Sequence, residues 1–380
     1  MNAPVPRLLR LVQRQVAVGQ PLPFSVRDEH GHLLLARGHV VADDAQLATL
    51  LDRGAYVDAE EAREALKAGA GGNEAAAPKA TLFDLWEQMI WRLQRVLHSV
   101  AEPGLPQRVA ELAGALMALQ RRDADIGIYL AMRQDPKRLS IYGLTHSLYS
   151  AMACSLAAAR LAWSEDDALC LVSAALTMNL PIIELQGRLA TQRDGPTPSQ
   201  LERVRAHPAA AADALAAAGV ANAAWLDAVR QHHERRDGQG YPSGLREVSP
   251  LALALRQADV LLAKVSPRAG RAAMPIQRAH RELFAEDGGG PFASALIKEF
   301  GIFPPGDFVQ LKSGEMAVVV RRGATATTPE VAAITDRSGM PVTSSVRRDT
   351  AKPDFAIVGP AADKALVLRV LPERLFGLVT

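Results

Sequence analysis

Apolar residues recur at helical spacing through most of the chain, from residue 82 to about residue 285. In the stretch 82–100, Trp86, Ile90, Leu93 and Leu97 fall on one helical face. The same spacing continues in further segments of the chain, which are 109–119, 126–133, 141–162, 166–180, 221–233 and 251–265. Thr197, Pro198 and Gln200 make a capping box, which predicts another helix start. The pattern predicts a mainly α protein built around a helical bundle.

The pattern changes at both ends of the chain. Residues 16–60 have two short apolar runs around Asp28–Gly31, which predict a hairpin. A leucine stripe opened by Asp43 or Asp44 and a short strand at Tyr56–Val57 follow. From about residue 301, proline and glycine turns separate apolar runs that are typical of strands: 308–311, 316–320, 330–335 and 355–358. We therefore expect a small α/β domain (1–60), a Gly/Ala-rich linker (61–81), the helical domain (82–300) and a β-rich C-terminal extension (301–380).

Composition narrows the functional classes. The 380 residues carry 43 Lys and Arg against 41 Asp and Glu, so the net charge is only +2. Proteins that bind nucleic acid or membrane surfaces usually concentrate positive charge, and we expect neither partner here. Cys154 and Cys170 are too few for a disulfide framework or a four-thiolate zinc site. With no secretory signal or membrane span visible in the sequence, we expect a cytoplasmic protein.

The most specific segment is HHERRDGQGYPSGL, residues 232–245. His232 and His233 end an apparent helix and are followed by Glu234. Adjacent histidines suit a core poorly, because each buried imidazole needs hydrogen-bond partners, but neutral imidazoles are good ligands for first-row metals. The residues that follow favour a turn-rich loop: Asp237, Gly238, Gly240, Tyr241 and Pro242.

This segment closely resembles the HHExxDGxGYPxGL signature of HD-GYP domains. The resemblance extends over most of residues 140–300. His146 and His207 resemble the family's metal histidines that precede the signature, and Asp259 resembles the carboxylate that follows it. Arg268 and Arg271 fall where the family has an arginine pair that implies ligand binding. The resemblance implies an HD-superfamily helical fold and hydrolysis of cyclic di-GMP at a cluster of two or three metals.

The chain departs from the family at its defining pair. Where HD-GYP domains carry a run like AALLHDIGK, this chain has AALTMNLPI, so Met178 and Asn179 replace the His-Asp pair and Ile182 replaces the lysine. A neutral Asn cannot bridge two dications as a carboxylate does, and a Met thioether is a soft ligand poorly suited to metals that act on phosphates. Tyr142 stands where trinuclear members have a glutamate.

The remaining candidate ligands are His146, His207, His232, His233 and Asp259. They would hold either one divalent metal, with iron or manganese favoured, or none, in which case they hydrogen-bond among themselves and to water. His98 and His280 lie outside every motif, and we expect both at the surface.

Three functions stay open on the sequence. The first is a catalytically inactive regulatory or binding module in cyclic di-GMP signalling. The resemblance then implies a diguanylate cyclase (GGDEF) domain as a partner at the GYP loop. Cyclic di-GMP itself and a second copy of this chain, in a homodimer, are the other candidate partners. The second is a weak metal-dependent phosphodiesterase that converts cyclic di-GMP to pGpG or GMP. The third is a sensor whose N-terminal domain recognises a ligand.

Overall fold

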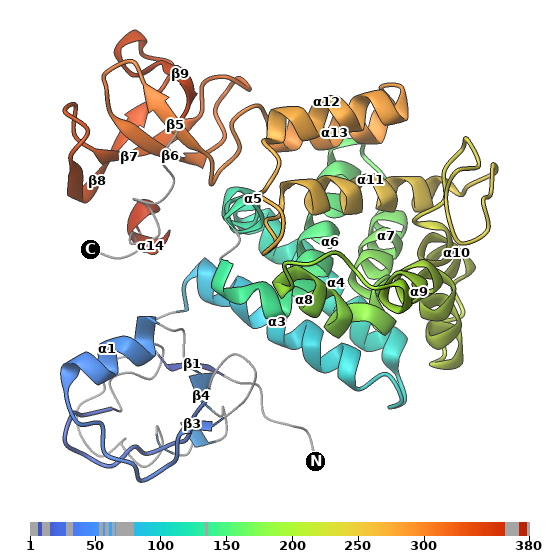
Figure 1. The fold of residues 1–380 in the computed structure, drawn as a ribbon, viewed down its shortest axis with the longest axis horizontal. Helices are drawn as coiled ribbons and strands as arrows, with labels where there is room; N and C mark the ends of the chain where they lie inside the picture. The colour runs from blue at the N-terminus through green and yellow to red at the C-terminus, as the bar shows by residue number, and fades with distance from the viewer. Residues whose placement is uncertain are drawn as a thin grey trace. The chain divides into compact units, whose positions relative to one another are not determined.

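The structure, a computed structural model, describes residues 7–9, 16–27, 33–52, 56–57, 61–62, 65, 80–133, 136–361 and 372–377. The chain divides into two compact units, Met1–Arg92 and Leu93–Thr380 (Figure 1). The division falls inside helix α3 (Leu82–His98). The boundaries that we expect at residues 60, 81 and 300 stay a prediction.

The N-terminal unit holds a small antiparallel sheet with strand order β1-β4-β2-β3. Its elements are β1 (Arg7–Leu8), β2 (Val26–Arg27), β3 (Leu33–Leu35), α1 (Asp44–Asp52) and β4 (Tyr56–Val57). The predicted hairpin is confirmed in its two paired strands, β2 and β3, while its turn lies outside the described residues. Asp43 caps α1, because its carboxylate accepts a hydrogen bond from the Gln46 amide at 2.7 Å.

The start of the predicted linker belongs to this small core. Ala62 is fully buried against the apolar cluster of the unit, and the Glu61 carboxylate accepts a hydrogen bond from the Ser25 amide at 2.6 Å. The rest of the linker, up to residue 79 and apart from Ala65, lies outside the described residues.

The second unit is mainly helical, as the sequence predicts (Figure 1). After α3 its α-helices are α4 (Leu105–Arg122), α5 (Ala124–Met132), α6 (Tyr142–Arg160), α7 (Glu165–Thr177), α8 (Ile183–Thr191), α9 (Pro198–Ala217), α10 (Ala223–Gln231), α11 (Pro250–Val265), α12 (Ile276–Asp287), α13 (Pro291–Phe300) and α14 (Pro372–Leu375). Short 3-10 helices are η2 (Pro136–Ile141), η3 (Leu180–Ile182) and η4 (Pro353–Phe355). The predicted capping box opens α9, since Thr197 and Gln200 exchange side-chain and backbone hydrogen bonds.

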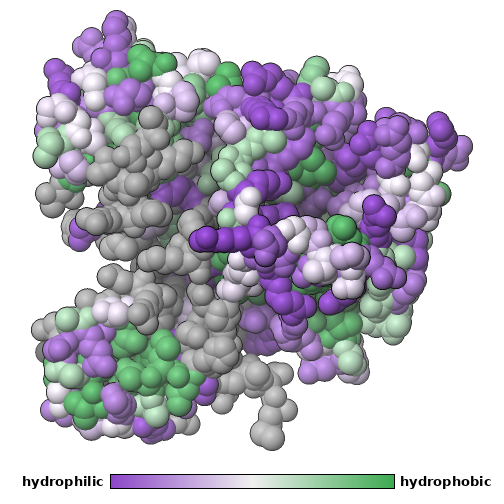
Figure 2. All heavy atoms as spheres, viewed as in Figure 1, coloured by the Kyte–Doolittle hydropathy of each residue, from purple (hydrophilic) through white to green (hydrophobic). Residues whose placement is uncertain are grey.

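Helix α6 is the centre of this unit. From Tyr142 to Ala158 every residue except Thr145 is buried, and α6 packs against α7, α8, α11 and α13. Polar residues in such a helix need partners from neighbouring helices, and His146 finds one on α11. On the face shown in Figure 2, hydrophilic side chains predominate over the helical part.

One stretch, Glu165–Thr191, is long and apolar enough to cross a membrane by length and composition. It comprises α7, η3 and α8, and 67% of its most apolar window is buried inside the fold. A core helix of a soluble protein passes the same test.

The β-rich C-terminal extension is an antiparallel sheet with strand order β8-β7-β6-β5-β9. Its strands are β5 (Phe308–Leu311), β6 (Met316–Arg321), β7 (Glu330–Thr335), β8 (Pro341–Asp349) and β9 (Ile357–Pro360). The apolar runs predict four of them. They do not reveal the edge strand β8, because most of its described residues are exposed and its sequence is polar.

Candidate metal centre

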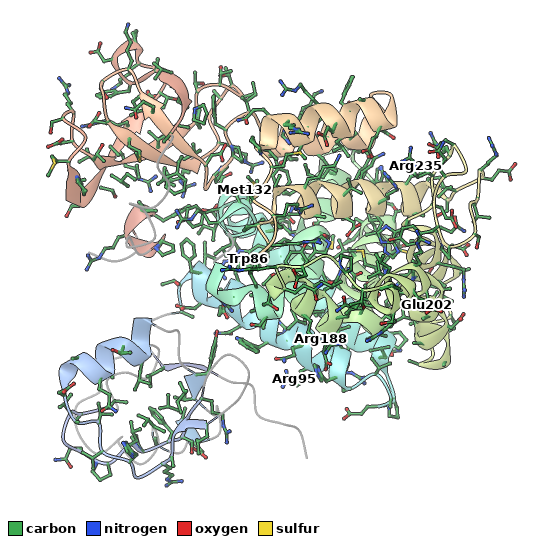
Figure 3. All side chains as sticks on the ribbon, viewed as in Figure 1. Trp86, Arg95, Met132, Arg188, Glu202 and Arg235 are labelled. Atoms are coloured by element: carbon green, nitrogen blue, oxygen red, sulfur yellow. The ribbon has the colours of Figure 1, made fainter. Side chains whose placement is uncertain are left out.

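Three of the five predicted ligands lie close together: His207, His232 and His233. His232 and His233 follow the end of α10, and His207 lies in the middle of α9 just before Pro208. Their candidate ligand atoms all lie within 4.8 Å of one another, and among the described residues these three make the one such group. The helix α9 can be found in Figure 3 by its labelled residue Glu202.

Hydrogen bonds fix how two of these rings face each other. His207 Nδ1 donates to the Val204 carbonyl and His232 Nδ1 to the Val229 carbonyl, each at 2.6 Å. A carbonyl oxygen only accepts, so in each neutral ring Nδ1 carries the proton and Nε2 carries the lone pair. The two Nε2 atoms nevertheless lie 3.1 Å apart.

Two lone pairs at that distance repel each other, and a cation between them would relieve this repulsion. Two nitrogen ligands at about 2.1 Å from one ion and at right angles to each other lie about 3.0 Å apart. The observed separation of 3.1 Å therefore fits cis ligands of a single cation. Imidazole suits zinc, copper, iron and nickel, and the same geometry admits manganese.

Burial keeps these imidazoles neutral. It lowers the pKa of His207 to about 3, with the charge of His232 adding to the effect. Burial also lowers the pKa of His232 and of His233, and for His233 the charge of His232 is the second cause. Neutral imidazole is the form that binds a metal, so these rings need not lose a proton first.

Asp259 on α11 connects the three clustered histidines to His146, the fourth predicted histidine ligand. Its Oδ1 accepts a hydrogen bond from His146 Nε2 at 2.6 Å, and its Oδ2 lies 3.9 Å from His233 Nδ1. Burial alone would raise the pKa of Asp259, but the hydrogen bond and charge of His146, with His233 and His232, hold it well below its usual range. The centre therefore combines neutral imidazoles with one carboxylate, a donor set suited to a divalent cation.

The HHE run and the GYP loop are built as one piece. The buried Glu234 carboxylate accepts hydrogen bonds from the amides of Ser243 at 2.7 Å and Leu245 at 3.0 Å. Gly240 passes so close that an added Cβ would lie 2.5 Å from the backbone of Glu234 and Arg235. Tyr241, which precedes Pro242 through a cis peptide bond, stacks on His233 with 4.5 Å between ring centroids.

The outer part of this loop faces solvent. Asp237 is exposed and pairs with Arg235, which is labelled in Figure 3, and its carboxylate also accepts from the Gln239 amide. Gly238 has a φ of +76°, a conformation that other residues rarely adopt. The loop thus holds His233 from its inner side and presents polar residues on its outer side.

Met178 and Asn179 follow α7 and lead into η3. Met178 is fully buried, Asn179 is 2% exposed, and Ile182 is 3% exposed. The Asn179 Nδ2 atom is buried and has no hydrogen-bond partner among the described residues. This segment therefore brings no ionised oxygen into the interior of the domain.

The two predicted ligand-binding arginines have different surroundings. The Arg268 guanidinium lies 5.0 Å from the centroid of the Tyr142 ring and donates to the Tyr142 hydroxyl at 3.1 Å. Arg271 donates to the backbone carbonyls of Ala263 and Ser266. Arg271 thus ties its own loop to the end of α11, and its proposed ligand contact stays a prediction.

The sequence prediction was wrong about one histidine, and it did not assign specific contacts to Glu234 and Tyr241. His280 is not at the surface: it is buried in α12, because it falls on the inward face of that helix with Ile276, Ala279 and Leu283. His98 is exposed, as expected. The anchoring role of Glu234 and the contact of Tyr241 with His233 come from tertiary geometry, although both residues stand in the recognised motif.

Comparison with known proteins finds similar sequences and a similar fold. Residues 133–289 match the family model described as HD domain. Over 172 residues the chain is 32% identical to the cyclic di-GMP phosphodiesterase PA4108 of Pseudomonas aeruginosa. This match covers 44% of this chain and 40% of the relative. Over 208 residues it is 29% identical to 3'3'-cGAMP-specific phosphodiesterase 3 of Vibrio cholerae, covering 52% of this chain and 43% of the relative.

The matched segments span less than half the length of either curated relative. The fold is similar to that of Bd1817, an HDG"Y"P protein from Bdellovibrio bacteriovorus, with a TM-score of 0.52 and 17% identity. That similarity covers 74% of this chain and 96% of the solved one. Residues 133–289 therefore match the HD domain family, and the chain has the fold of an HD-GYP protein of known structure.

Proposed function

We propose that this chain is a cytoplasmic regulatory module of cyclic di-GMP signalling that binds its ligand without hydrolysing it. The observation that carries the proposal is the buried Met178-Asn179 pair. Two-metal hydrolysis of a phosphodiester needs a metal-activated hydroxide and a second cation to neutralise developing charge. A thioether and a neutral amide at this place supply no bridging carboxylate.

The proposed ligand class rests on the relatives. Both are phosphodiesterases that act on cyclic dinucleotides, one on cyclic di-GMP and the other on 3'3'-cGAMP. We propose cyclic di-GMP as the ligand, with Arg268 and Arg271 as candidate phosphate contacts.

We also propose that the centre holds one divalent cation, iron or manganese by preference. His207, His232 and His233 would supply the imidazoles and Asp259 the carboxylate. When bound, such an ion supplies positive charge that can attract a phosphate group.

The outer face of the GYP loop is the proposed contact for a protein partner. Arg236, Asp237, Pro242 and Leu245 are exposed there. A diguanylate cyclase (GGDEF) domain or a second copy of this chain is the partner that we propose for this surface.

A weak metal-dependent phosphodiesterase is the second candidate. It is favoured by the pre-arranged imidazoles and the ionised Asp259, which make a site able to hold a cation. A single ion can still polarise a phosphate, so slow hydrolysis to pGpG or GMP would be its signature.

The two candidates separate in a gain-of-function experiment. We expect the purified wild type with Mn²⁺ or Fe²⁺ to leave cyclic di-GMP intact. The double variant Met178→His/Asn179→Asp restores the family's pair and should hydrolyse it at least about tenfold faster than the wild type. Its metal content, measured by elemental analysis, should rise from one ion per chain to two.

Asn222→Asp is the matched control. Asn222 caps α10 through a hydrogen bond to the Trp225 amide, and Asp caps a helix equally well, so this exchange adds a carboxylate away from the centre and should add no hydrolysis. Turnover by the wild type that disappears in His233→Ala would reject the inactive module in favour of the phosphodiesterase.

A further inference from the structure

A line of four side chains joins the surface loop after α11 to the metal centre. Arg268 Nη2 donates to the Tyr142 hydroxyl at 3.1 Å, and this hydroxyl lies 3.4 Å from His146 Nδ1. His146 Nε2 in turn lies 2.6 Å from Asp259 Oδ1. The Tyr142 and His146 rings are stacked, with 15° between their planes.

The chemistry of the two ends determines the direction of these hydrogen bonds. The guanidinium of Arg268 only donates, and the carboxylate of Asp259 only accepts. The His146 proton therefore sits on Nε2, which leaves Nδ1 as the acceptor for the Tyr142 hydroxyl. Both ring nitrogens of His146 are thereby used.

This distinguishes His146 from the other histidines of the centre. In His207 and in His232, Nδ1 donates a hydrogen bond to a backbone carbonyl, and the lone pair of Nε2 faces the other ring. His146 leaves no lone pair toward the cluster. Neither His146 nor Asp259 belongs to the group of three converging ligand atoms among the described residues, but Asp259 keeps a free oxygen on that side. The oxygen of Asp259 that His146 does not hold, Oδ2, faces His233.

We propose that His146 and Tyr142 are positioning residues, and that they aim Asp259 Oδ2 at a cation bound by His207, His232 and His233. This inference rests on the single cation of the proposed function. Histidines that ligate a metal are commonly oriented by a carboxylate behind them. Here the order is reversed: the carboxylate is the ligand, and a histidine and a tyrosine orient it.

The same line disfavours a second cation at this end of the centre. Arg268 places a permanent positive charge beside Tyr142, one hydrogen bond away from His146. A dication bound near His146 Nδ1 would be repelled by that guanidinium and would displace the Tyr142 hydroxyl. Together with the absence of a His-Asp pair at positions 178 and 179, this charge limits the wild-type site to one ion.

Cobalt(II) tests this inference, because its visible absorption reports the ligand set directly, whatever the activity of the protein. The full chain should bind one Co²⁺, and His207→Ala should both alter the band and abolish tight binding. His146→Asn keeps an N–H donor, so it should leave the band unchanged and weaken binding by about 10–100-fold. Tyr142→Phe, which removes one oxygen, should weaken binding by about tenfold with the band again unchanged.

Tyr129→Phe, at a buried tyrosine of α5, is the matched control and should bind cobalt like the wild type. A His146→Asn band that changes as the His207→Ala band does would make His146 a ligand and overturn the inference. Unchanged affinity in Tyr142→Phe, or two cobalt ions per wild-type chain, would also overturn it. A wild type that binds no cobalt would reject it too, whereas the lack of hydrolysis is measured separately and would still stand.

Discussion

His207 and His280 are both buried histidines on helices, and their neighbours decide what each can do. The ring of His207 meets His232 and His233, while His280 Nε2 is buried without a hydrogen-bond partner among the described residues. Burial lowers the pKa of both, to about 3 for His207 and to about 4 for His280. Where three such rings converge they can share a cation, whereas a single one only makes the fold sensitive to acid.

The His280→Leu variant should be less sensitive to acid than the wild type. Burial is the cause of the lowered pKa of His280, about 4 against 6.5, so the unfolded chain binds a proton first as the pH falls. Stability is therefore fully present above pH 6.5 and is lost toward pH 4. Between pH 7.5 and pH 5 the wild type should lose about 2 kcal/mol more unfolding free energy than the variant.

Urea unfolding at the two pH values measures that difference. His98→Gln changes an exposed histidine and should lose stability in acid as the wild type does. Equal acid loss in His280→Leu and the wild type would contradict the assignment.

At the scale of elements, two glycines let three helical segments meet closely beside the centre. A Cβ on Gly143 of α6 would collide with the Ile183 carbonyl at the start of α8, and one on Gly187 of α8 with the Ser140 carbonyl of η2. Gly143 lies between Tyr142 and Leu144, so this contact fixes the start of α6 and with it the first turn that carries Tyr142 and His146. Neither glycine has a positive φ, so backbone conformation does not require glycine at these positions. The close approach of the neighbouring backbones requires it instead.

Gly187→Ala should therefore destabilise the fold by about 3 kcal/mol, because backbone must shift to admit one methyl group. Gly114→Ala in α4 is its control: no atom lies within 4 Å of the added Cβ, so the exchange should stabilise the helix by about 0.5–1 kcal/mol. Thermal unfolding measures the stability of both variants. Equal changes in stability would show that the close approach of α8 to η2 does not exclude a side chain at Gly187.

At the scale of the molecule, a charged network joins the β-rich extension to the helical part of the same unit. Arg322, just after β6, lies 2.5 Å from Asp125 of α5 and 2.5 Å from Glu299 of α13. Arg160 of α6 pairs with the same Glu299 at 2.5 Å. Burial raises the pKa of Asp125 against the opposing charge of Arg322, so this carboxylate depends on its arginine.

Removal of Arg322 should loosen the extension. Arg322→Ala leaves Asp125 and Glu299 largely buried without this partner, and we expect a loss of about 2–3 kcal/mol, allowing for the part of Arg322 that is solvent-exposed. Limited proteolysis should then cut the connection near residues 301–306 faster than in the wild type. Arg278→Ala breaks an exposed ion pair with Glu282 and should leave the stability close to that of the wild type. Equal losses of stability in the two arginine variants would contradict the role of the network.

Much of the fold could be predicted because its signals are local. Helical periodicity, the capping box at Thr197 and the apolar runs after residue 301 lie in short windows of sequence, and the structure has the corresponding helices and strands. The polar edge strand β8 and the buried His280 could not be predicted, since both depend on which face another element covers. The family signature located the candidate ligands, which the periodicity of the helices alone does not reveal.

The sequence by itself determined the mainly helical fold, the GYP segment and the Met178-Asn179 pair, because each of these is a matter of residue type and spacing. Only the tertiary structure decided how the candidate ligands divide. It brings α9, α10 and α11 together so that three imidazoles converge, and it sets Tyr142 and Arg268 behind His146. The direction of a hydrogen bond depends on what lies opposite each nitrogen, and residues more than a hundred positions apart meet only when the chain has folded.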